Sequence, residues 1–566
     1  MQKRFGNAGA FEPSNGRTDM TDDKNKVDSQ LITGQESLRV FEGLNRGMSR
    51  RDALRMLGVA GIAAAGAGSL FGSAGQVFAA TSASTGQGKQ GGRIKVATST
   101  SSTADTLDPA KGANYTDYCR HNMFYNGLAV LDAQLTPRMA LAESFDTDDA
   151  TSWTIKLRKD VLFHDGRPFT SADVVYSLNR HKLPETGSRV VAIAQQLEEV
   201  KAVGPHEVQI RLVSPNADLP AILATTYFLI VRDGTNDFAI ANGTGPFKCA
   251  EFQPGVRSIS ARNASYWKPG LPYLDEIEFF SIPDEAARIS ALLAGDVDLI
   301  NPINPRSVAR IQESAKVELM ETPTGGYTNL GLRDNLGPVQ NPDFVLAMKY
   351  LQDRKQINRV AFRGYGVIAN DQPVAPSNRY YFAGLPQREY DLDKARFHLQ
   401  KSGMAGRPLP LVCSDAATGS VDIAQLLQLS GQQIGLKLDI KRMPADGYWS
   451  SHWMKHPLYF GNIGARPTVD LMFSLFYQSS AGMNESGWKN EQFDQLLVAA
   501  RGETDEAKRK QMYGDMQVLV NEHCGVGIAQ FNSSLDGHSV KLKGLTPHPL
   551  GGMMGYMFAE NVWLDA

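Results

Sequence analysis

A pair of histidines is the first group in this sequence that could do chemistry. His452 and His456 lie four positions apart, about one turn of a helix, so their imidazoles could share a metal ion. No glutamate follows the first histidine, so the pattern of a zinc metalloprotease is absent. Pro457 also disfavours helix at the residue before it. We therefore predict no resident metal site, and a nickel chelate bound through a carrier molecule stays open as a ligand.

A glycine-rich stretch at residues 243–246, Gly-Thr-Gly-Pro, is the second candidate. It lacks the Lys-Ser/Thr ending of a phosphate-binding loop and the spacing of a dinucleotide fingerprint, so we interpret it as a tight turn. His164 and Asp165 precede Gly166, and we interpret them as parts of a turn between a strand and a helix.

The sequence contains no group of residues with the spacing of a catalytic site. It has no Gly-x-Ser-x-Gly elbow and no flavin fingerprint, and the paired carboxylates at 148–149 lie at a turn. The four cysteines lie far apart and form no Cys-x-x-Cys motif. We therefore predict no catalytic residue, no cofactor and no enzyme activity. The alternative is an exported hydrolase whose catalytic residues form no recognisable motif.

The balance of charge excludes further classes of protein. The 566 residues include 58 Lys and Arg against 60 Asp and Glu, for a formal net charge of −2. A nucleic-acid-binding protein normally shows a basic excess, so we expect no nucleic-acid partner. Hydrophobic residues make up 42% of the chain and its mean hydropathy is −0.28, which suits a folded protein and excludes a polytopic membrane protein. At roughly 150 residues per domain, the length predicts three or four domains.

The first 79 residues have the order of an export leader. Paired arginines at 50–51 precede an uncharged apolar run rich in Ala and Gly at 56–71, and Val77 and Ala79 supply small residues at the −3 and −1 positions of a cleavage site. The arginine pair indicates the twin-arginine type. The uncharged run is about 16 residues long, short of the roughly 20 that span a bilayer, so we favour export over a membrane anchor. We predict a periplasmic protein whose signal peptide is cleaved near Ala79.

The rest of the chain alternates strands with helices. Apolar and polar residues alternate at 153–157 and 206–213, as in half-buried strands, and a further strand is expected at 297–300. This alternation predicts an α/β fold. Helices are expected to begin at residues of types that commonly cap helix N-termini, namely Ser171, Asp284, Asn341, Asp391 and Thr504.

The stretch from residue 153 to 178 resembles the hallmark segment of the family 5 bacterial extracellular solute-binding proteins. Its centre reads Phe-His-Asp-Gly-Arg-Pro-Phe-Thr-Ser-Ala-Asp-Val. An ordered set of such pieces is far more specific than one alone, and the resemblance covers about residues 93–566. The other pieces, in family order, are Leu-Asp-Pro at 107–109, Tyr-Asn-Gly-Leu at 125–128, Gly-Thr-Gly-Pro-Phe at 243–247, Asn-x-x-Tyr-Trp at 263–267, Ala-Gly-Asp-Val-Asp at 294–298 and Tyr-Asp-Leu-Asp-Lys-Ala at 390–395.

The resemblance implies an α/β fold like that of type II periplasmic binding proteins, with two lobes, a hinge and an inserted third subdomain. Two crossing strands, about 327–332 and 527–531, would form the hinge. The implied divisions are a leader at 1–79, a flexible linker at 80–92, a first lobe at 93–325 with the inserted subdomain at about 131–265, a second lobe at 326–529 and a return to the first lobe at 530–566.

The resemblance also implies an extracytoplasmic substrate-binding receptor of an ABC importer. Such a receptor captures a peptide-like or other amphipathic solute between its lobes, closes on it and delivers it to the permease. The implied partners are the solute, the permease subunits in the inner membrane and the twin-arginine export machinery, and we expect a monomer. The sequence leaves the ligand open among peptides, opines, modified sugars and metal chelates.

One segment departs from the pattern of the family's peptide receptors. Those receptors meet the ligand's amine with an acidic residue and often read Trp-x-x-Asp-x-x-Asp-Pro there. Residues 461–476 of this chain contain no tryptophan and place Arg466 where acidic residues are expected, leaving Asp470 as the nearby carboxylate. This departure argues against a free dipeptide ligand. Arg466 is expected either to bind an anionic ligand group through two parallel hydrogen bonds or to form a salt bridge within the protein.

Aromatic side chains are the remaining candidates for the ligand site. Trp488 lies in a loop rich in Gly, Ser and Asn and is expected to be exposed, while Tyr115, Tyr327 and Asn329 are assigned by their positions in the family. The predicted ligand-binding residues are Tyr115, Tyr327, Asn329, Arg466, Asp470 and Trp488.

Overall fold

Residues 88–333, 336 and 341–565 are described in the computed structural model of this protein. By internal contacts the chain divides into two units, residues 1–86 and 87–566, and the helices and strands named here belong to the second. The predicted leader, its twin-arginine signal, the cleavage near Ala79 and linker residues 80–87 lie outside the described residues.

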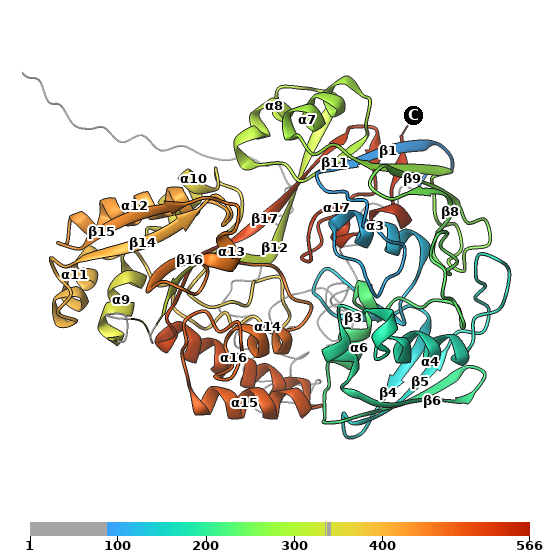
Figure 1. The fold of residues 1–566 in the computed structure, drawn as a ribbon, viewed down its shortest axis with the longest axis horizontal. Coiled ribbons are helices and arrows are strands. Elements are labelled where there is room, and N and C mark those ends of the chain that lie inside the picture. The colour runs from blue at the N-terminus through green and yellow to red at the C-terminus, as the bar shows by residue number, and fades with distance from the viewer. Residues whose placement is uncertain (1–87, 334–335, 337–340, 566) are drawn as a thin grey trace, which may run out of the picture. The chain divides into compact units, whose positions relative to one another are not determined.

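Two long strands run through both halves of the second unit (Figure 1). Strand β12 (Val317–Leu332) pairs in antiparallel register with β17 (Val526–Ser539), from Val317 opposite Ser539 to Gly331 opposite Val526. The register shifts twice near the middle, once between Pro323 and Tyr327. The β12 residues from Tyr327 onward are all buried, as expected for a strand covered on both faces. The two strands therefore join what we call the first and second lobes.

The first lobe extends the sheet on the β17 side. Strand β11 (Leu299–Asn301) lies next to β17, followed by β1 (Arg93–Thr98), β10 (Glu276–Ser281), β9 (Arg257–Arg262) and β8 (Phe247–Gln253). Helices α3 (Tyr115–Phe124) and α7 (Glu285–Ala294) belong to this lobe.

Local sequence signals account for much of this lobe. Helix α7 begins after Asp284, whose side chain accepts a 2.7 Å hydrogen bond from the Ala287 amide, and it ends at Gly295 with φ of +83°. The predicted helix is thus confirmed at both ends. The following strand is β11, two residues later than the predicted start at 297.

A smaller antiparallel sheet lies within the first lobe's part of the chain. Its order is β4 (Ala142–Asp146), β5 (Ser152–Leu157), β7 (Glu207–Leu212) and β6 (Leu197–Gly204). Buried residues alternate along β5 and β7, as predicted from the sequence, and they pack against α4 (Ser171–Arg180). Helix α4 is capped by Thr170 together with Asp173, so the predicted cap at Ser171 is wrong by one residue.

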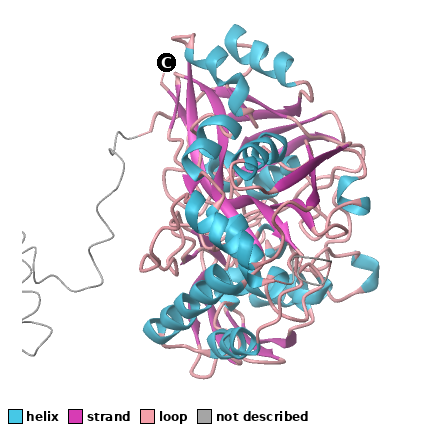
Figure 2. Cartoon of the chain, turned by 90° about the vertical axis from the view of Figure 1, so that its left-hand side faces the viewer, coloured by secondary structure: helices cyan, strands magenta, loops and turns pink. Residues whose placement is uncertain are grey.

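The second lobe extends the sheet on the β12 side. Strand β16 (Leu458–Ile463) pairs with β12, and β14 (Pro408–Ser414) and β15 (Lys437–Met443) follow in parallel. Figure 2, which views this side of the unit, shows helices lying against these strands. These helices are α9 (Pro342–Tyr350), α10 (Arg354–Ala361), α11 (Leu392–Lys401), α12 (Ser420–Gln432), α13 (Tyr448–Ser451), α14 (Val469–Phe476), α15 (Glu491–Gly502) and α16 (Glu506–His523).

The predicted helix starts in the second lobe hold with one exception. Asn341 and Asp391 cap α9 and α11 through their side chains, as predicted. Helix α16 is capped by Asp505 instead of Thr504. The shorter elements are β2 (Ala129–Leu131), β3 (Pro137–Met139), α5 (Val191–Ala194), α6 (Leu219–Leu223), α8 (Val308–Gln312), β13 (Val367–Ile368), β18 (Leu542–Lys543), α17 (Gly552–Gly555) and β19 (Trp563–Leu564).

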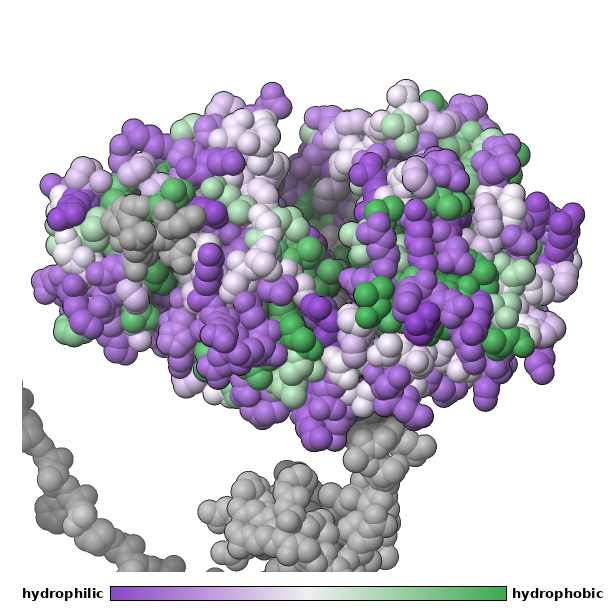
Figure 3. Space-filling view, turned by 60° about the horizontal axis from the view of Figure 1, so that its bottom comes forward, coloured by the Kyte–Doolittle hydropathy of each residue, from purple (hydrophilic) through white to green (hydrophobic). Residues whose placement is uncertain are grey.

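The architecture confirms the predicted fold class, a mixed α/β protein with two lobes joined by long strands. The surface is hollowed between the two lobes, and hydrophobic side chains gather beside the hollow (Figure 3). Among the described residues, no helix combines the length and apolar character that crossing a membrane requires.

A fully buried carboxylate ties the second lobe to β17. Asp371 accepts hydrogen bonds from Arg354 at 2.6 Å and from Arg388 at 2.5 Å. It also accepts a 3.0 Å hydrogen bond from the Ile528 amide of β17. The two guanidinium groups hold the pKa of Asp371 below its usual range despite burial. The native structure therefore depends on a negative charge at this position.

Replacing Asp371 with Asn should lower the free energy of unfolding by about 3 kcal/mol, because the change leaves two buried guanidinium groups without their counter-ion. Asn keeps the size of the side chain and tolerates the φ of +52° found here, so the variant isolates the loss of charge. Urea unfolding measures the effect. The matched control is Asp415→Asn, which breaks an exposed pair with Arg442 and should cost less than about 0.5 kcal/mol. Equal losses in the two variants would contradict the assignment.

Candidate functional site

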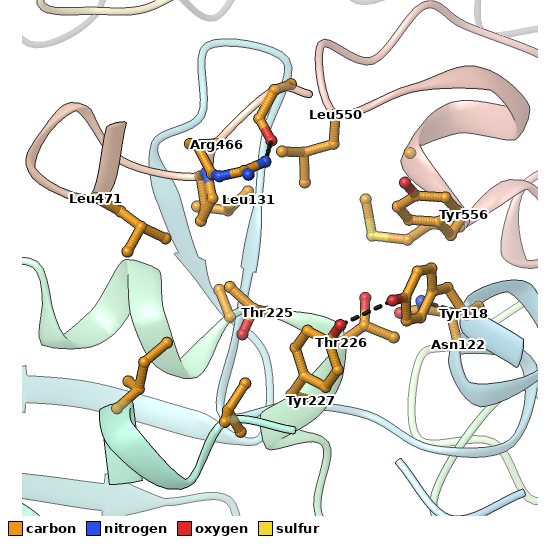
Figure 4. Close-up of a pocket in the computed structure, with 17 residues that line it drawn as sticks. Tyr118, Asn122, Leu131, Thr225, Thr226, Tyr227, Arg466, Leu471, Leu550 and Tyr556 are labelled. Atoms are coloured by element: carbon orange, nitrogen blue, oxygen red, sulfur yellow. Dashed lines mark hydrogen bonds between the residues drawn. The ribbon is translucent and has the colours of Figure 1, made fainter. Parts of the chain in front are cut away.

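A cavity of about 380 Å³ lies between the two lobes. The first lobe contributes α3, the turn at residues 224–227 and the segment around α17. The second lobe contributes residues 465–467 and Leu471, from the loop after β16 and the start of α14. Figure 4 shows side chains from these separate elements facing one space. A solute held there would touch both lobes at once, which is the geometry that couples binding to closure.

Three tyrosines form one wall of the cavity. The hydroxyls of Tyr118 and Tyr227 lie 2.7 Å apart and share a hydrogen bond (Figure 4). The ring of Tyr118 also meets the ring of Tyr556 edge to face, with centroids 5.3 Å apart. Burial raises the pKa of Tyr118 and of Tyr556 above the usual value, so these two hydroxyls are uncharged at neutral pH. The wall offers aromatic faces and hydroxyl groups to a ligand.

Arg466 provides the charge of the cavity. Its Nη1 donates hydrogen bonds to the carbonyl oxygens of Gly464 at 3.1 Å and Ala465 at 3.2 Å, and its guanidinium lies 5.2 Å from the centre of the Phe476 ring. Burial lowers its pKa, but arginine titrates so high that the side chain stays cationic. Within the described part of the chain no carboxylate lies within 4.0 Å of it, so the predicted alternative of a salt bridge within the protein is not seen there.

The wall near Tyr556 is built from an unusual backbone turn. Met553, Met554, Gly555 and Tyr556 have φ of +48°, +56°, +61° and +76° in succession, a left-handed turn that costs about 1–2 kcal/mol for each residue other than glycine. Such conformations persist where surrounding contacts hold them, often at ligand sites.

Asp536 on β17 holds this turn in place. Its carboxylate accepts a 2.6 Å hydrogen bond from the Met553 amide and another hydrogen bond from the Asn301 side chain. A Cβ on Gly552 would lie 2.4 Å from a carboxylate oxygen, so only glycine fits beside it. Burial raises the pKa of Asp536 to about 7.

The structure places Asp470 and Tyr115 behind the cavity wall. Asp470 is buried and accepts a 3.0 Å hydrogen bond from Arg501, and burial raises its pKa to about 6. The Tyr115 ring packs against Tyr556, with centroids 4.8 Å apart. Neither residue lines the cavity.

The two predicted hinge-strand residues point into the second lobe. The Tyr327 hydroxyl lies 2.9 Å from that of Tyr477, and both rings are buried. Asn329 donates a 2.5 Å hydrogen bond to Glu485, whose carboxylate is also bonded by Trp453. Burial raises the pKa of Glu485 to about 7. Neither Tyr327 nor Asn329 lines the cavity.

Trp488 is buried, so its predicted exposure is wrong. Asn484 donates a 2.7 Å hydrogen bond to the Trp488 carbonyl, and the resulting turn directs the indole ring against Phe493, with centroids 5.3 Å apart. The polar loop composition misled the prediction because the loop's polar groups bond to one another. Of the six predicted residues, Arg466 is the one that the structure places in the cavity wall.

The histidines singled out in the sequence stack on or bond to other groups of the protein. His452 and His456 stack with ring centroids 5.5 Å apart and ring nitrogens 3.2 Å apart. Among the residues described, no three or more His, Cys, Asp or Glu side chains are arranged to hold a metal ion. The ring of His164 bonds to the Gly245 carbonyl at 3.1 Å, and Asp165 accepts a 2.8 Å hydrogen bond from Arg232. Both belong to a turn, as predicted.

Sequence reasoning missed the tyrosine wall. Tyr118, Tyr227 and Tyr556 come from three segments that only the tertiary fold brings together. One signal was available for the first of them: Tyr118 lies three positions after Tyr115, on a neighbouring face of the same helix.

The chain is similar in sequence to known proteins. Residues 136–485 match the family model described as "Bacterial extracellular solute-binding proteins, family 5 Middle". The glutathione-binding protein GsiB of Escherichia coli K12 is 26% identical over 434 residues, which cover 73% of this chain and 84% of that protein.

Solved structures share the fold. The ABC transporter substrate-binding protein CtaP of Listeria monocytogenes superposes with a TM-score of 0.74 at 21% identity, covering 84% of this chain and all of that one. The periplasmic binding protein DppA of Helicobacter pylori, solved with the peptide STSA, gives a TM-score of 0.68 at 22% identity, covering 84% of this chain and 99% of that one.

Asp536→Asn should weaken the dependence of stability on pH. The native pKa of about 7 lies above the value of about 3.9 that an aspartate has in an unfolded chain. The native state therefore keeps a proton that the unfolded state has released, so the contribution of Asp536 to stability is full at low pH and is lost as the pH rises through 7. Between pH 5 and 8 the wild type should lose roughly 2 kcal/mol more than the variant in urea unfolding.

Asp439→Asn is the control for this experiment, because Asp439 is exposed and should leave the wild-type pH dependence unchanged. Glu485 and Asp470 titrate in the same direction as Asp536 but remain in both proteins, so the difference between wild type and variant reports Asp536. The same loss of stability in wild type and Asp536→Asn would contradict the assignment.

Proposed function

The chain belongs to the bacterial extracellular solute-binding proteins of family 5, and from this premise we propose that it is the receptor of an ABC importer that captures a small amphipathic solute between its lobes. The observation that carries the proposal is the cavity lined by both lobes, beside the strands that join them. A solute there stabilises the closed arrangement through contacts with both walls, and the closed form is then handed to the permease.

The relatives support this assignment. GsiB is named a glutathione-binding protein, and the DppA structure contains a peptide. Peptide-like solutes share an apolar or amphipathic body with at least one carboxylate. In this chain Arg466 would bind such a carboxylate, and the three tyrosines would pack against the body. No feature of the described residues favours the alternative of an exported hydrolase.

The location and organisation of the protein form part of the same proposal. Export by the twin-arginine machinery with cleavage near Ala79 would place the mature chain in the periplasm, where it would act as a monomer. We propose the lobe divisions expected from the sequence, 93–325 with the insert at 131–265, 326–529 and 530–566. The position of β12 and β17 in the middle of the large sheet supports them.

Intrinsic tryptophan fluorescence tests the capture of a solute. We expect a saturable change on titration with at least one member of a panel of glutathione, short peptides and opine-type carboxylates, with the solute recovered unchanged. Turnover of the solute would support the hydrolase instead. No saturable response, together with no small molecule in the native mass spectrum of the purified protein, would contradict the proposal.

Arg466→Ala should weaken binding of the responding solute at least tenfold, which corresponds to about 1.4 kcal/mol, because it removes the cation of the cavity. Isothermal titration measures the affinity, and circular dichroism checks that the variant is folded. Arg442→Ala is the matched control, since Arg442 lies on the surface in an exposed pair with Asp415. An affinity within about twofold of wild type would rule out Arg466 as a ligand contact.

A further inference from the structure

The charged groups of the cavity define what kind of solute it accepts. We propose that the solute is a carboxylate that carries no free ammonium group, held at its anionic end by Arg466. This inference rests on the proposed function, since it names the ligand class of the same cavity.

The lining of the cavity contains one cation and no anion. Arg466 is its one side chain that is charged at neutral pH, and none of the 17 described residues that line it is Asp or Glu. An ammonium group entering this space would lose its hydration without meeting a carboxylate. It would also be repelled by Arg466, whereas a carboxylate would be attracted.

The carboxylates behind the cavity wall already have partners. Asp470 bonds to Arg501 at 3.0 Å, and Asp218 lies 2.8 Å from Arg509. Glu560, which lines a smaller neighbouring cavity, lies 2.8 Å from Lys268. Each would have to leave a cation to meet a ligand amine, and leaving that cation without its counter-ion is unfavourable.

Asp536 is a further carboxylate near the cavity, and it too is bonded to other groups of the protein. Its oxygens accept hydrogen bonds from the Met553 amide and from Asn301, and it is fully buried behind the turn that carries Tyr556. It does not line the cavity. A ligand ammonium therefore has no carboxylate to bind among these four groups.

Arg466 is set up to bind a carboxylate along one edge. Its Nη1 donates hydrogen bonds to the carbonyls of Gly464 and Ala465, and these bonds fix the orientation of the guanidinium. Its Nε and Nη2 donate to no acceptor among the described residues, although both carry hydrogens. These two nitrogens form the side of the guanidinium that takes a carboxylate through two parallel hydrogen bonds.

The rest of the wall suits an uncharged body. Leu131, Leu471 and Leu550 lie around Arg466, and the rings of Tyr227 and Tyr556 lie across the cavity from it (Figure 4). Apolar side chains and aromatic faces stabilise a ligand body by excluding water from it. A carboxylate whose amine is acylated or otherwise blocked fits both Arg466 and the uncharged wall. A zwitterion fits Arg466 alone, because its ammonium group meets no anion in the cavity.

Three probes of nearly equal size distinguish the effect of the ligand's carboxylate from the effect of its ammonium group. N-acetyl-leucyl-leucine carries a carboxylate and no ammonium, leucyl-leucine carries both, and N-acetyl-leucyl-leucine amide carries neither. Isothermal titration of the wild-type protein should show the first probe binding at least tenfold more tightly than the other two. In Arg466→Ala the advantage of the first probe over its amide should vanish, and in Arg442→Ala it should persist.

The outcomes distinguish the ligand class from the receptor function. Binding of leucyl-leucine as tight as, or tighter than, that of its acetylated form overturns the ligand class and leaves the receptor function standing. Binding of none of the three probes also overturns the ligand class. In that case the native mass spectrum of the purified protein decides the receptor function, which stands if a small molecule is bound and falls if none is.

Discussion

The pairing of β12 with β17 is the constraint on which the rest of the structure depends. These two strands run through both lobes. Every other strand of the large sheet in the described chain pairs with one of them, directly or through intervening strands. The same pair positions the cavity. Asp536 on β17 holds the turn bearing Tyr556, and β16, which precedes the Arg466 loop, pairs with β12. A shift in register between the two strands would move the cation and the aromatic wall relative to each other.

Four of the five fully buried arginines of the described chain pair with carboxylates, whereas Arg288 and the partly buried Arg466 bond to backbone carbonyls instead. Arg354 and Arg388 share Asp371, Arg120 pairs with Asp105, and Arg180 pairs with Asp108 through two hydrogen bonds. Those pairs offset the cost of burying charge. Arg466 has only backbone carbonyls and an aromatic ring as partners, while part of its guanidinium faces the cavity. A ligand anion would complete the pairing that the protein itself leaves open.

The sequence predicted the fold better than the site, for physical reasons. Helix caps such as Asp284 and strand alternation such as that at 153–157 are local, so they can be read from a few neighbouring residues, and the ordered motifs identified the family. The cavity depends on contacts between segments hundreds of positions apart. Arg466 was found because its charge departed from the family pattern, whereas Tyr227 and Tyr556 had no local signal. Trp488 was misassigned because loop composition does not report how a loop's own polar groups bond.

The most direct test of this account is a crystal structure of the protein with N-acetyl-leucyl-leucine. We predict electron density between the lobes, with the carboxylate oxygens within hydrogen-bonding distance of Nε and Nη2 of Arg466 and the side chains against Tyr227 and Tyr556. Density for the probe elsewhere, or a carboxylate turned away from Arg466, would contradict the central claim that an unpaired cation between two lobes selects the solute.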